Sequence, residues 1–203
     1  MKKTKVTCGL TVSLDGFAAG HNQSFEKPFG DGFDSDLLDR WMFAEPEKHR
    51  HKKEIDAILD AGAFIMGSNM FGPKDRRDKS GWKGWWGDNP PYHAPVFVLS
   101  HKERPPIEME GGTIFHFVTT GIEAALSMAK DAAGDQNVKI MGGANTINQY
   151  LAAGLIDELW LHLVPVTIGV GSRLFEDVPN LRLEPVEVSG TGLVTHIRYK
   201  VEK

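Results

Sequence analysis

The residues best suited to chemistry stand where a short apolar run gives way to two glycines, Gly142 and Gly143. The run Val138–Met141 is typical of a buried strand, and residues 144–151 repeat apolar side chains at helical spacing. Glycines carry no Cβ, so phosphates can approach the backbone, and the first N–H groups of a helix have no internal partner. The helix dipole also favours negative charge there. The pattern predicts either a site for the pyrophosphate of a dinucleotide or a tight strand-to-helix turn that binds nothing.

A second junction of this kind follows the apolar run Ala63–Gly67. Ser68, Asn69 and Met70 come directly after its glycine and open a short helical stretch that reaches Phe71. Free amides and polar side chains at the end of a buried strand are suited to contact a phosphate.

Two long segments have neither helical nor strand periodicity. Residues 18–34 are rich in Gly, Asn, Asp and Ser, and residues 72–95 contain Trp82, Trp85 and Trp86. Loops of this length in a compact domain are usually functional or mobile. The tryptophan-rich loop is expected to pack over the edge of the core, to cover a ligand or to fill a dimer interface, and the sequence leaves these three alternatives open.

Histidine and cysteine form no metal-binding pattern. His49 and His51 are two residues apart on an expected helix, so their side chains point to different faces, and we interpret residues 49–53 as a solvated charged face. His162 lies within an apolar strand and is expected to be a hydrogen-bonded core residue. Cys8, the single cysteine, is expected to be buried and unreactive. We therefore expect no metal site.

The elements that must position these residues follow from hydrophobic periodicity. Eight strands are expected, over Val6–Val12, Ala63–Gly67, Val96–Leu99, Ile114–Val118, Val138–Met141, Leu159–Val164, Leu181–Val188 and Leu193–Val201. Helices are expected from a Ser35 cap to about Ala44, from Pro46 to Ala61, from a capping box at Thr120–Glu123 to Ala133, and over residues 144–151 with Gly154 as the C-cap.

This alternation of strands and helices predicts an α/β fold. We expect a three-layer αβα arrangement around a mixed, mostly parallel eight-stranded sheet, with a C-terminal antiparallel hairpin. The 203 residues suit a single domain over residues 1–203, large enough to fold without a disulfide or a metal.

The composition excludes several kinds of partner. The net charge is −4, and there is no long run of Lys or Arg of the kind that binds nucleic acid. No apolar run approaches the length of a membrane span, and no signal-peptide core follows the basic N-terminus. We expect a cytoplasmic protein that acts on a small molecule.

The order of these motifs resembles the dihydrofolate reductase fold. Within that fold, the sequence is more similar to the reductase domain of riboflavin biosynthesis, the RibD C-terminal-like group. The segments that carry the resemblance span nearly the whole chain: Ser13–Phe17, Ile65–Gly67, Pro95–Ser100, Met141–Ala144, Leu155–Leu159, Pro165–Val166 and Gly169–Gly171.

The resemblance implies NADPH as the hydride donor. By position, the pyrophosphate would be held by Gly142, Gly143, Ala144, Asn145 and Thr146, and the bond between the two glycines is often cis in the family. The resemblance also implies contacts from Gly67, Ser68, Asn69 and Met70 to the phosphates and ribose, from Ser100 to the adenosine, and from Ala19 and Gly20 near the nicotinamide.

One position departs from the family pattern. The family commonly has an Arg directly after the glycine of the second strand, where it grips the 2′-phosphate of NADPH, and this chain has Ser68. A serine does not replace a bidentate, permanently charged group. His101 and Lys102 are candidates to supply the charge instead.

Two acids are candidates for the proton donor that a reduction requires. The resemblance places an acid in the first helix near the substrate, which by position is Asp36, and Asp15 is its rival beside the end of the first strand. Each has an ordinary structural alternative, since Asp36 would also serve the helix dipole and Asp15 would also form a turn.

We therefore expect an NADPH-dependent reductase. Its substrate would be a small heterocycle, pteridine- or pyrimidine-like, or a ribosylamino compound, as for 5-amino-6-(5-phosphoribosylamino)uracil reductase and dihydrofolate reductase. The alternative is a nucleotide-binding homodimer without turnover. The resemblance also implies a homodimer, with the Leu159–Val166 region and the terminal hairpin as candidate interfaces.

Overall fold

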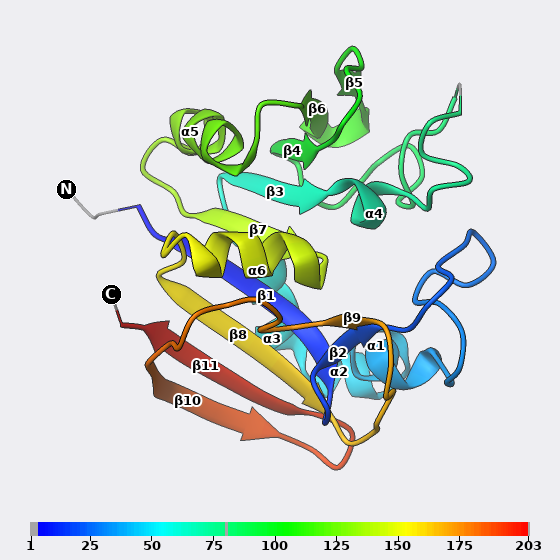
Figure 1. Cartoon of the computed structure of the whole chain (residues 1–203), viewed down its shortest axis with the longest axis vertical. Helices are drawn as coiled ribbons and strands as arrows, with labels where there is room; N and C mark the ends of the chain where they lie inside the picture. The colour runs from blue at the N-terminus through cyan, green and yellow to red at the C-terminus, as the bar shows by residue number, and fades with distance from the viewer. Residues whose placement is uncertain (1–3, 80, 203) are drawn as a thin grey trace.

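The chain folds around one twisted sheet whose parallel strands are joined mainly by helices (Figure 1). The computed structural model describes residues 4–79 and 81–202. The strands are β1 Val6–Ser13, β2 Phe17–Ala19, β3 Ala63–Gly67, β4 Pro95–Leu99, β5 Ile107–Glu108, β6 Ile114–Val118, β7 Val138–Gly142, β8 Glu158–Val164, β9 Ser172–Arg173, β10 Leu183–Gly190 and β11 Thr195–Val201. The helices are α1 Asp36–Phe43, α2 Glu47–Arg50, α3 Lys52–Leu59, α4 Ser68–Phe71, η1 Glu110–Gly112, α5 Ile122–Ala133 and α6 Ala144–Ala152.

Within the described residues, the main sheet has nine strands in the order β10-β11-β8-β1-β7-β3-β4-β6-β5. The central strands from β8 to β6 pair in parallel, and β5, β11 and β10 pair antiparallel with their neighbours. All eight expected strands are present, and the mostly parallel α/β arrangement with a C-terminal hairpin is confirmed. The ninth strand, β5, spans two residues, which is too short for a periodic pattern to reveal.

Alternation along the strands sends side chains to both faces of the sheet. Ile65 of β3 packs with α5 and α6 in one core, whereas its neighbours Phe64 and Met66 belong to a second core on the opposite side. A third cluster joins Leu38 and Trp41 of α1 to the end of β8. Two apolar faces must each be covered, so helices and loops form layers on both sides of the sheet.

One expected helix is divided in the structure, and two expected side-chain caps are not formed, although α1 begins after Ser35 and ends near Ala44 as expected. The helix expected from Pro46 to Ala61 is divided into α2 and α3 at His51, whose ring is buried and hydrogen-bonded to His196 instead of facing solvent. At the start of α1 the Ser35 side chain makes no capping hydrogen bond, and Asp34 Oδ1 accepts the Asp36 N–H at 3.2 Å. The capping box at Thr120 is not formed, because Gly121 occupies the N-cap position of α5.

The segment 18–34 is more ordered than its sequence suggested. Its start continues strand β2, which pairs antiparallel with β9 in a small separate sheet. His21 and Asp31 then pair as an isolated bridge, and the Gly20 N–H donates to the Phe29 carbonyl at 2.8 Å. The pairing of β2 with β9 joins residues distant along the chain, and the other two contacts are isolated, so neither produces a local periodicity in the sequence.

Candidate functional site

Two strand-to-helix junctions meet at the carboxyl end of the central strands. β3 and β7 are parallel neighbours, so α4 and α6 begin side by side at the same edge of the sheet. Thr146 in the first turn of α6 packs directly on Gly67, and a Cβ at that position would collide with the Thr146 hydroxyl. Gly67 is therefore required for the close approach of the two junctions.

The first turn of α6 has backbone amides available for an anion. No side chain caps this helix, and its first intrahelical bond runs from the Ile147 N–H to the Gly143 carbonyl at 3.1 Å. A Cβ built on Gly143 meets no atom within 4 Å, so there is open space over the junction. The peptide bond between Gly142 and Gly143 is cis, as the family resemblance implied. A helix N-terminus with free amides and open space is suited to bind a phosphate.

A cavity of about 550 Å³ lies over this edge. It brings together ten of the eleven residues expected to bind the cofactor: Ala19, Gly67, Ser68, Asn69, Met70, Ser100, Gly143, Ala144, Asn145 and Thr146. Gly142 lies just behind them as the last residue of β7. The cavity is large enough for much of a dinucleotide, and both expected phosphate-binding junctions contribute to its wall.

Arg77 is a cavity-lining residue that sequence reasoning missed. Its guanidinium donates a hydrogen bond to Asn69 Oδ1, and its backbone carbonyl accepts one from Arg104 at 2.8 Å. His101 also lines the cavity, whereas Lys102 pairs with Asp78 at 2.6 Å on the exposed surface. Arg77 lies in the loop that has no periodicity, so no local signal could have placed it beside Asn69.

The two long loops touch each other, and each also contributes to the cavity wall, the first through Gln23, Pro28 and Phe29 and the second through Arg77. Phe25 from the first loop stacks on Trp85 from the second, with ring centroids 5.7 Å apart, and Trp82 meets Phe25 edge-on. Trp82 and Trp86 also pack against the core cluster around Phe71 and Phe115. Packing over the core edge is therefore confirmed for Trp82 and Trp86, while roles in covering a ligand or filling a dimer interface stay predictions.

The two acids named from the sequence lie outside this cavity's lining. Asp36 is exposed in the first turn of α1. Asp15 accepts hydrogen bonds from the Ile168 and Gly169 N–H groups and from the Ser13 hydroxyl. Desolvation raises the pKa of this carboxyl, but the hydrogen bonds outweigh it and hold the pKa below its ordinary value. Asp15 thereby joins the end of β1 to the loop after β8, and the catalytic role of either acid stays a prediction.

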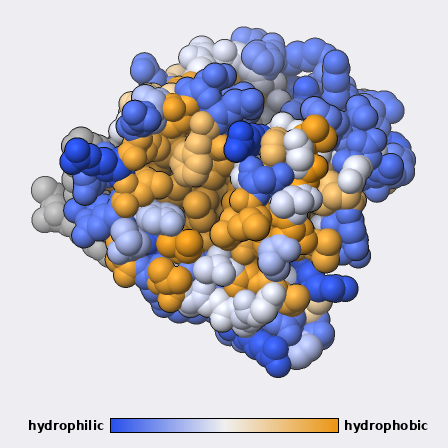
Figure 2. All heavy atoms as spheres, turned by 60° about the horizontal axis from the view of Figure 1, so that its bottom comes forward, coloured by the Kyte–Doolittle hydropathy of each residue, from blue (hydrophilic) through white to orange (hydrophobic). Residues whose placement is uncertain are grey.

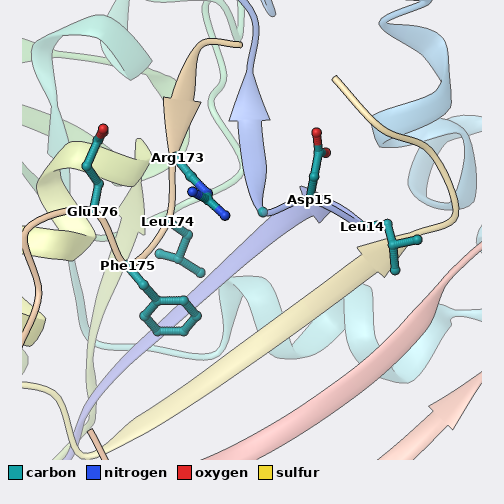
Figure 3. A pocket seen from close by; sticks show the side chains of 7 residues that line it. Leu14, Asp15, Arg173, Leu174, Phe175 and Glu176 are labelled. Atoms are coloured by element: carbon teal, nitrogen blue, oxygen red, sulfur yellow. The ribbon is translucent and has the colours of Figure 1, made fainter. Parts of the chain in front are cut away.

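Asp15 also borders a smaller hollow of about 420 Å³ (Figure 3). Arg173 and Phe175 approach this hollow from one side, and Leu14 and Asp15 approach it from the other.

Half-exposed Asp39 of α1 is a third acid to consider. Burial raises its pKa to about 6, and the negative charge of Asp36 adds to the shift. A desolvated acid of this kind cannot be recognised before the fold is known.

Cys8 and His162 are both buried in the core, as expected from the sequence. Cys8 is fully buried, and desolvation raises its pKa to about 12, so the thiol stays protonated. His162 is buried and its Nδ1 lies 2.7 Å from His196 Nδ1, which confirms the expected hydrogen-bonded core histidine. Burial lowers the pKa of His162 to about 3, and the adjacent His196 adds to the shift.

Comparison with known proteins identifies the family. The family model for the RibD C-terminal domain matches residues 4–195. The chain belongs to the RibD C-terminal domain family. Among curated relatives of this RibD-type domain, the uncharacterized protein YyaP of Bacillus subtilis is 24% identical over 96% of this chain and 94% of its own length.

Solved structures agree with the fold of this RibD-type domain. A Shewanella sp. PV-4 protein, assigned by name to riboflavin biosynthesis, gives a TM-score of 0.67 at 22% identity, covering 98% of this chain and all of its own. Dihydrofolate reductase from Enterococcus faecalis, complexed with NADP(H), gives a TM-score of 0.52 at 13% identity, covering 98% and 97% of the two chains. The RibD-type domain therefore has the dihydrofolate-reductase-like fold. Among the described residues, no helix is long and apolar enough to cross a membrane.

Proposed function

We propose that this RibD-type domain is an NADPH-dependent reductase of a small heterocyclic or ribosylamino substrate. The observation that carries the proposal is the single cavity into which the free amides of α6, the Ser68–Met70 turn and Ser100 all open. Family membership supports a reductase of the riboflavin or dihydrofolate type. Residues that fit a diphosphate at a helix N-terminus also fit a dinucleotide cofactor.

The chain's contribution would be binding, orientation and exclusion of water. The α6 amides would hold the pyrophosphate, and Ala19, which also lines the cavity, would lie near the nicotinamide. When bound, the cofactor supplies a hydride. The aromatic contacts of Phe25 with Trp82 and Trp85 would close the mouth of the cavity, so that the reacting centres are held together away from solvent.

Arg77 supports NADPH over NADH. Among the described residues, it is the one Arg or Lys that lines the cavity, and Asn69 holds its guanidinium beside the α4 turn. A guanidinium is well suited to bind a phosphate on the adenosine ribose, because arginine binds phosphate through two parallel hydrogen bonds. Arg77 would therefore take the place of the arginine that Ser68 replaces.

A homodimer is proposed as the assembly. The hairpin of β10 and β11 extends the sheet, and Leu161, Ile197 and Val188 lie opposite one another across β8, β11 and β10. Figure 2, which brings this end forward, shows apolar side chains gathered over a wide surface. Val188 is 63% exposed, and such a surface is typical of a protein interface.

The test of the proposed function is titration with NADPH, following tryptophan emission and melting temperature. We expect quenching and a thermal shift, followed by loss of NADPH absorbance when pteridine- and pyrimidine-like substrates are added. Neither quenching nor a thermal shift at millimolar NADPH would overturn the proposal. Binding without oxidation by any substrate would instead support the nucleotide-binding protein without turnover.

A further inference from the structure

A buried polar cluster lies on the layer formed by α1, α2 and α3, and the proposed reductase does not use it. It consists of His51 at the junction of α2 and α3, Glu54 one turn further on, and His196 of β11. Their exposed fractions are 2%, 6% and 2%. Ionisable and imidazole side chains are costly to bury unless their polar atoms have partners, so the partners of these three side chains must be identified.

The inner atoms of these three side chains converge. His51 Nδ1 lies 2.9 Å from His196 Nε2, and one carboxylate oxygen of Glu54 completes a set whose members are all within 4.8 Å of one another. Two imidazole nitrogens and a carboxylate oxygen are ligand atoms for a first-row divalent transition ion such as Zn²⁺.

The outer atom of each side chain is held by a second residue. His196 Nδ1 lies 2.7 Å from His162 Nδ1, and His51 Nε2 lies 3.3 Å from the Thr191 hydroxyl. Glu54 Oε1 accepts the Ser189 hydroxyl at 2.8 Å. Metal-binding histidines and carboxylates are characteristically oriented by such outer hydrogen bonds, which fix the ring and select the tautomer.

The packing around the cluster restricts its geometry. The Trp41 ring contacts His51, His162 and His196, with ring centroids 4.7–5.8 Å away. On the outer side, Glu47 Oε2 lies 3.8 Å from His51 Nε2, and this oxygen is buried without a hydrogen-bond partner. The Trp41 ring excludes water from one side of the cluster, and the Glu47 carboxylate on the other side favours the binding of a cation.

We propose that His51, Glu54 and His196 bind one divalent transition-metal ion of the zinc type. For His51 Nδ1 and His196 Nε2 to bind an ion, the hydrogen bond between them would break, and both rings would carry their proton on the outer nitrogen, toward Thr191 and His162. The ion joins α3 to strand β11 and leaves at least one coordination position for a further ligand.

The test is calorimetric titration of chelator-treated full-length protein with Zn²⁺, together with melting curves and the visible spectrum of the Co²⁺ form. We expect one ion per chain and a rise in melting temperature of about 5 °C or more when the free zinc concentration is about 100-fold above Kd. Co²⁺ should show the intense visible absorption of a low-coordinate site.

Glu54→Gln and His196→Asn should each weaken binding by at least ~10-fold. Glu54→Gln preserves the shape and an oxygen for Ser189, so it tests the charge without removing the packing. His49→Ala is the matched control, because His49 is 72% exposed and pairs with Glu45 at 3.1 Å on the surface. It should bind as tightly as the unmodified protein.

Three results would overturn the metal site: no stoichiometric uptake by the unmodified protein, unchanged affinity in Glu54→Gln, or loss of binding in His49→Ala. If Glu54→Gln and His196→Asn do not fold, the Co²⁺ spectrum of the unmodified protein still tests the proposal. A weak, octahedral-type spectrum would reject the site. None of these measurements involves NADPH, so the metal site and the proposed reductase fail independently.

Discussion

At the scale of single residues, Arg77 is held by one hydrogen bond of its side chain and one of its backbone. Its guanidinium is bonded to Asn69, and its carbonyl is bonded to Arg104, whose guanidinium also lies over the ring of Phe117 at 4.5 Å. A charged group anchored in this way loses little entropy when it binds a phosphate, so it can discriminate between two cofactors that differ by one phosphate.

We predict that Arg77→Met raises the Kd for NADPH by ~10-fold or more and changes the Kd for NADH by less than ~3-fold. Binding of both cofactors is measured by fluorescence titration. Lys74→Met is the control, because Lys74 is exposed in the same loop and its substitution by Met also removes one positive charge. An equal loss of affinity for both cofactors would show that Arg77 does not recognise the 2′-phosphate.

Asp39 carries the second prediction at this scale. Because burial raises its pKa to about 6 in the folded chain, the native state binds an extra proton between about pH 4 and pH 6. The stability that this proton provides is present at low pH and is lost as the pH rises through 6. We expect a decrease of about 1–2 kcal/mol in unfolding free energy over this interval, given the half-exposed position.

Asp39→Asn should abolish this part of the pH dependence in urea unfolding at pH 4.5 and pH 7.5. Asp36→Asn should reduce it only in part, because desolvation is the larger cause of the shift. If Asp39 donates the proton, turnover also falls as the pH rises through about 6. A pH dependence unchanged by Asp39→Asn would show that the carboxyl is not perturbed.

At the scale of elements, the contact between the two long loops connects segments that share no strand or helix. Phe25 stacks on Trp85 with an interplanar angle of 7°, and the Arg76 guanidinium lies over the Phe25 ring, 4.7 Å from its centre. An exposed contact of this kind contributes about 0.5–1.5 kcal/mol. Because this contribution is small, we expect the two loops to be able to separate when a ligand enters or leaves.

We predict that Trp85→Ala raises the Kd for NADPH by ~3- to 10-fold and lowers the melting temperature by less than about 4 °C. Part of the NADPH-dependent quenching should disappear with it. Trp160→Ala is the comparison, since Trp160 lies on β8 against Arg198, away from the cavity lining. If both variants bind NADPH alike, the loops do not cover the cofactor.

At the scale of the whole molecule, the hairpin extends the sheet and adds apolar surface. The side chains opposite one another on β8, β11 and β10 belong to the face that α6 covers nearer the centre. Monomeric proteins rarely expose a large contiguous apolar surface, so a second copy of the chain is the partner that we propose for this face.

We predict that Val188→Lys converts the proposed dimer to a monomer, measured by sedimentation velocity. A charge buried at an interface without a partner costs more than the apolar contact contributes. Met128→Lys, on the exposed side of α5, is the control and should leave the assembly unchanged. A protein that is monomeric before any substitution would contradict the proposed interface.

The sequence by itself determined the periodic features of this protein. The eight strands, the α5 and α6 helices and the two glycine-containing junctions follow from the spacing of apolar residues and from what glycine permits, and both are local properties. Ten of the eleven expected cofactor residues share one cavity because the carboxyl ends of parallel strands meet at one edge of a sheet.

Only the tertiary structure decided the remaining groups. Arg77 reaches Asn69 through an aperiodic loop, His51 meets His196 across 145 positions of the chain, and the pKa of Asp39 depends on the protein that surrounds it. Contacts between distant segments and the loss of water around a charge depend on how the layers pack. Neither leaves a pattern in the order of residues, so neither can be recognised until the chain is folded.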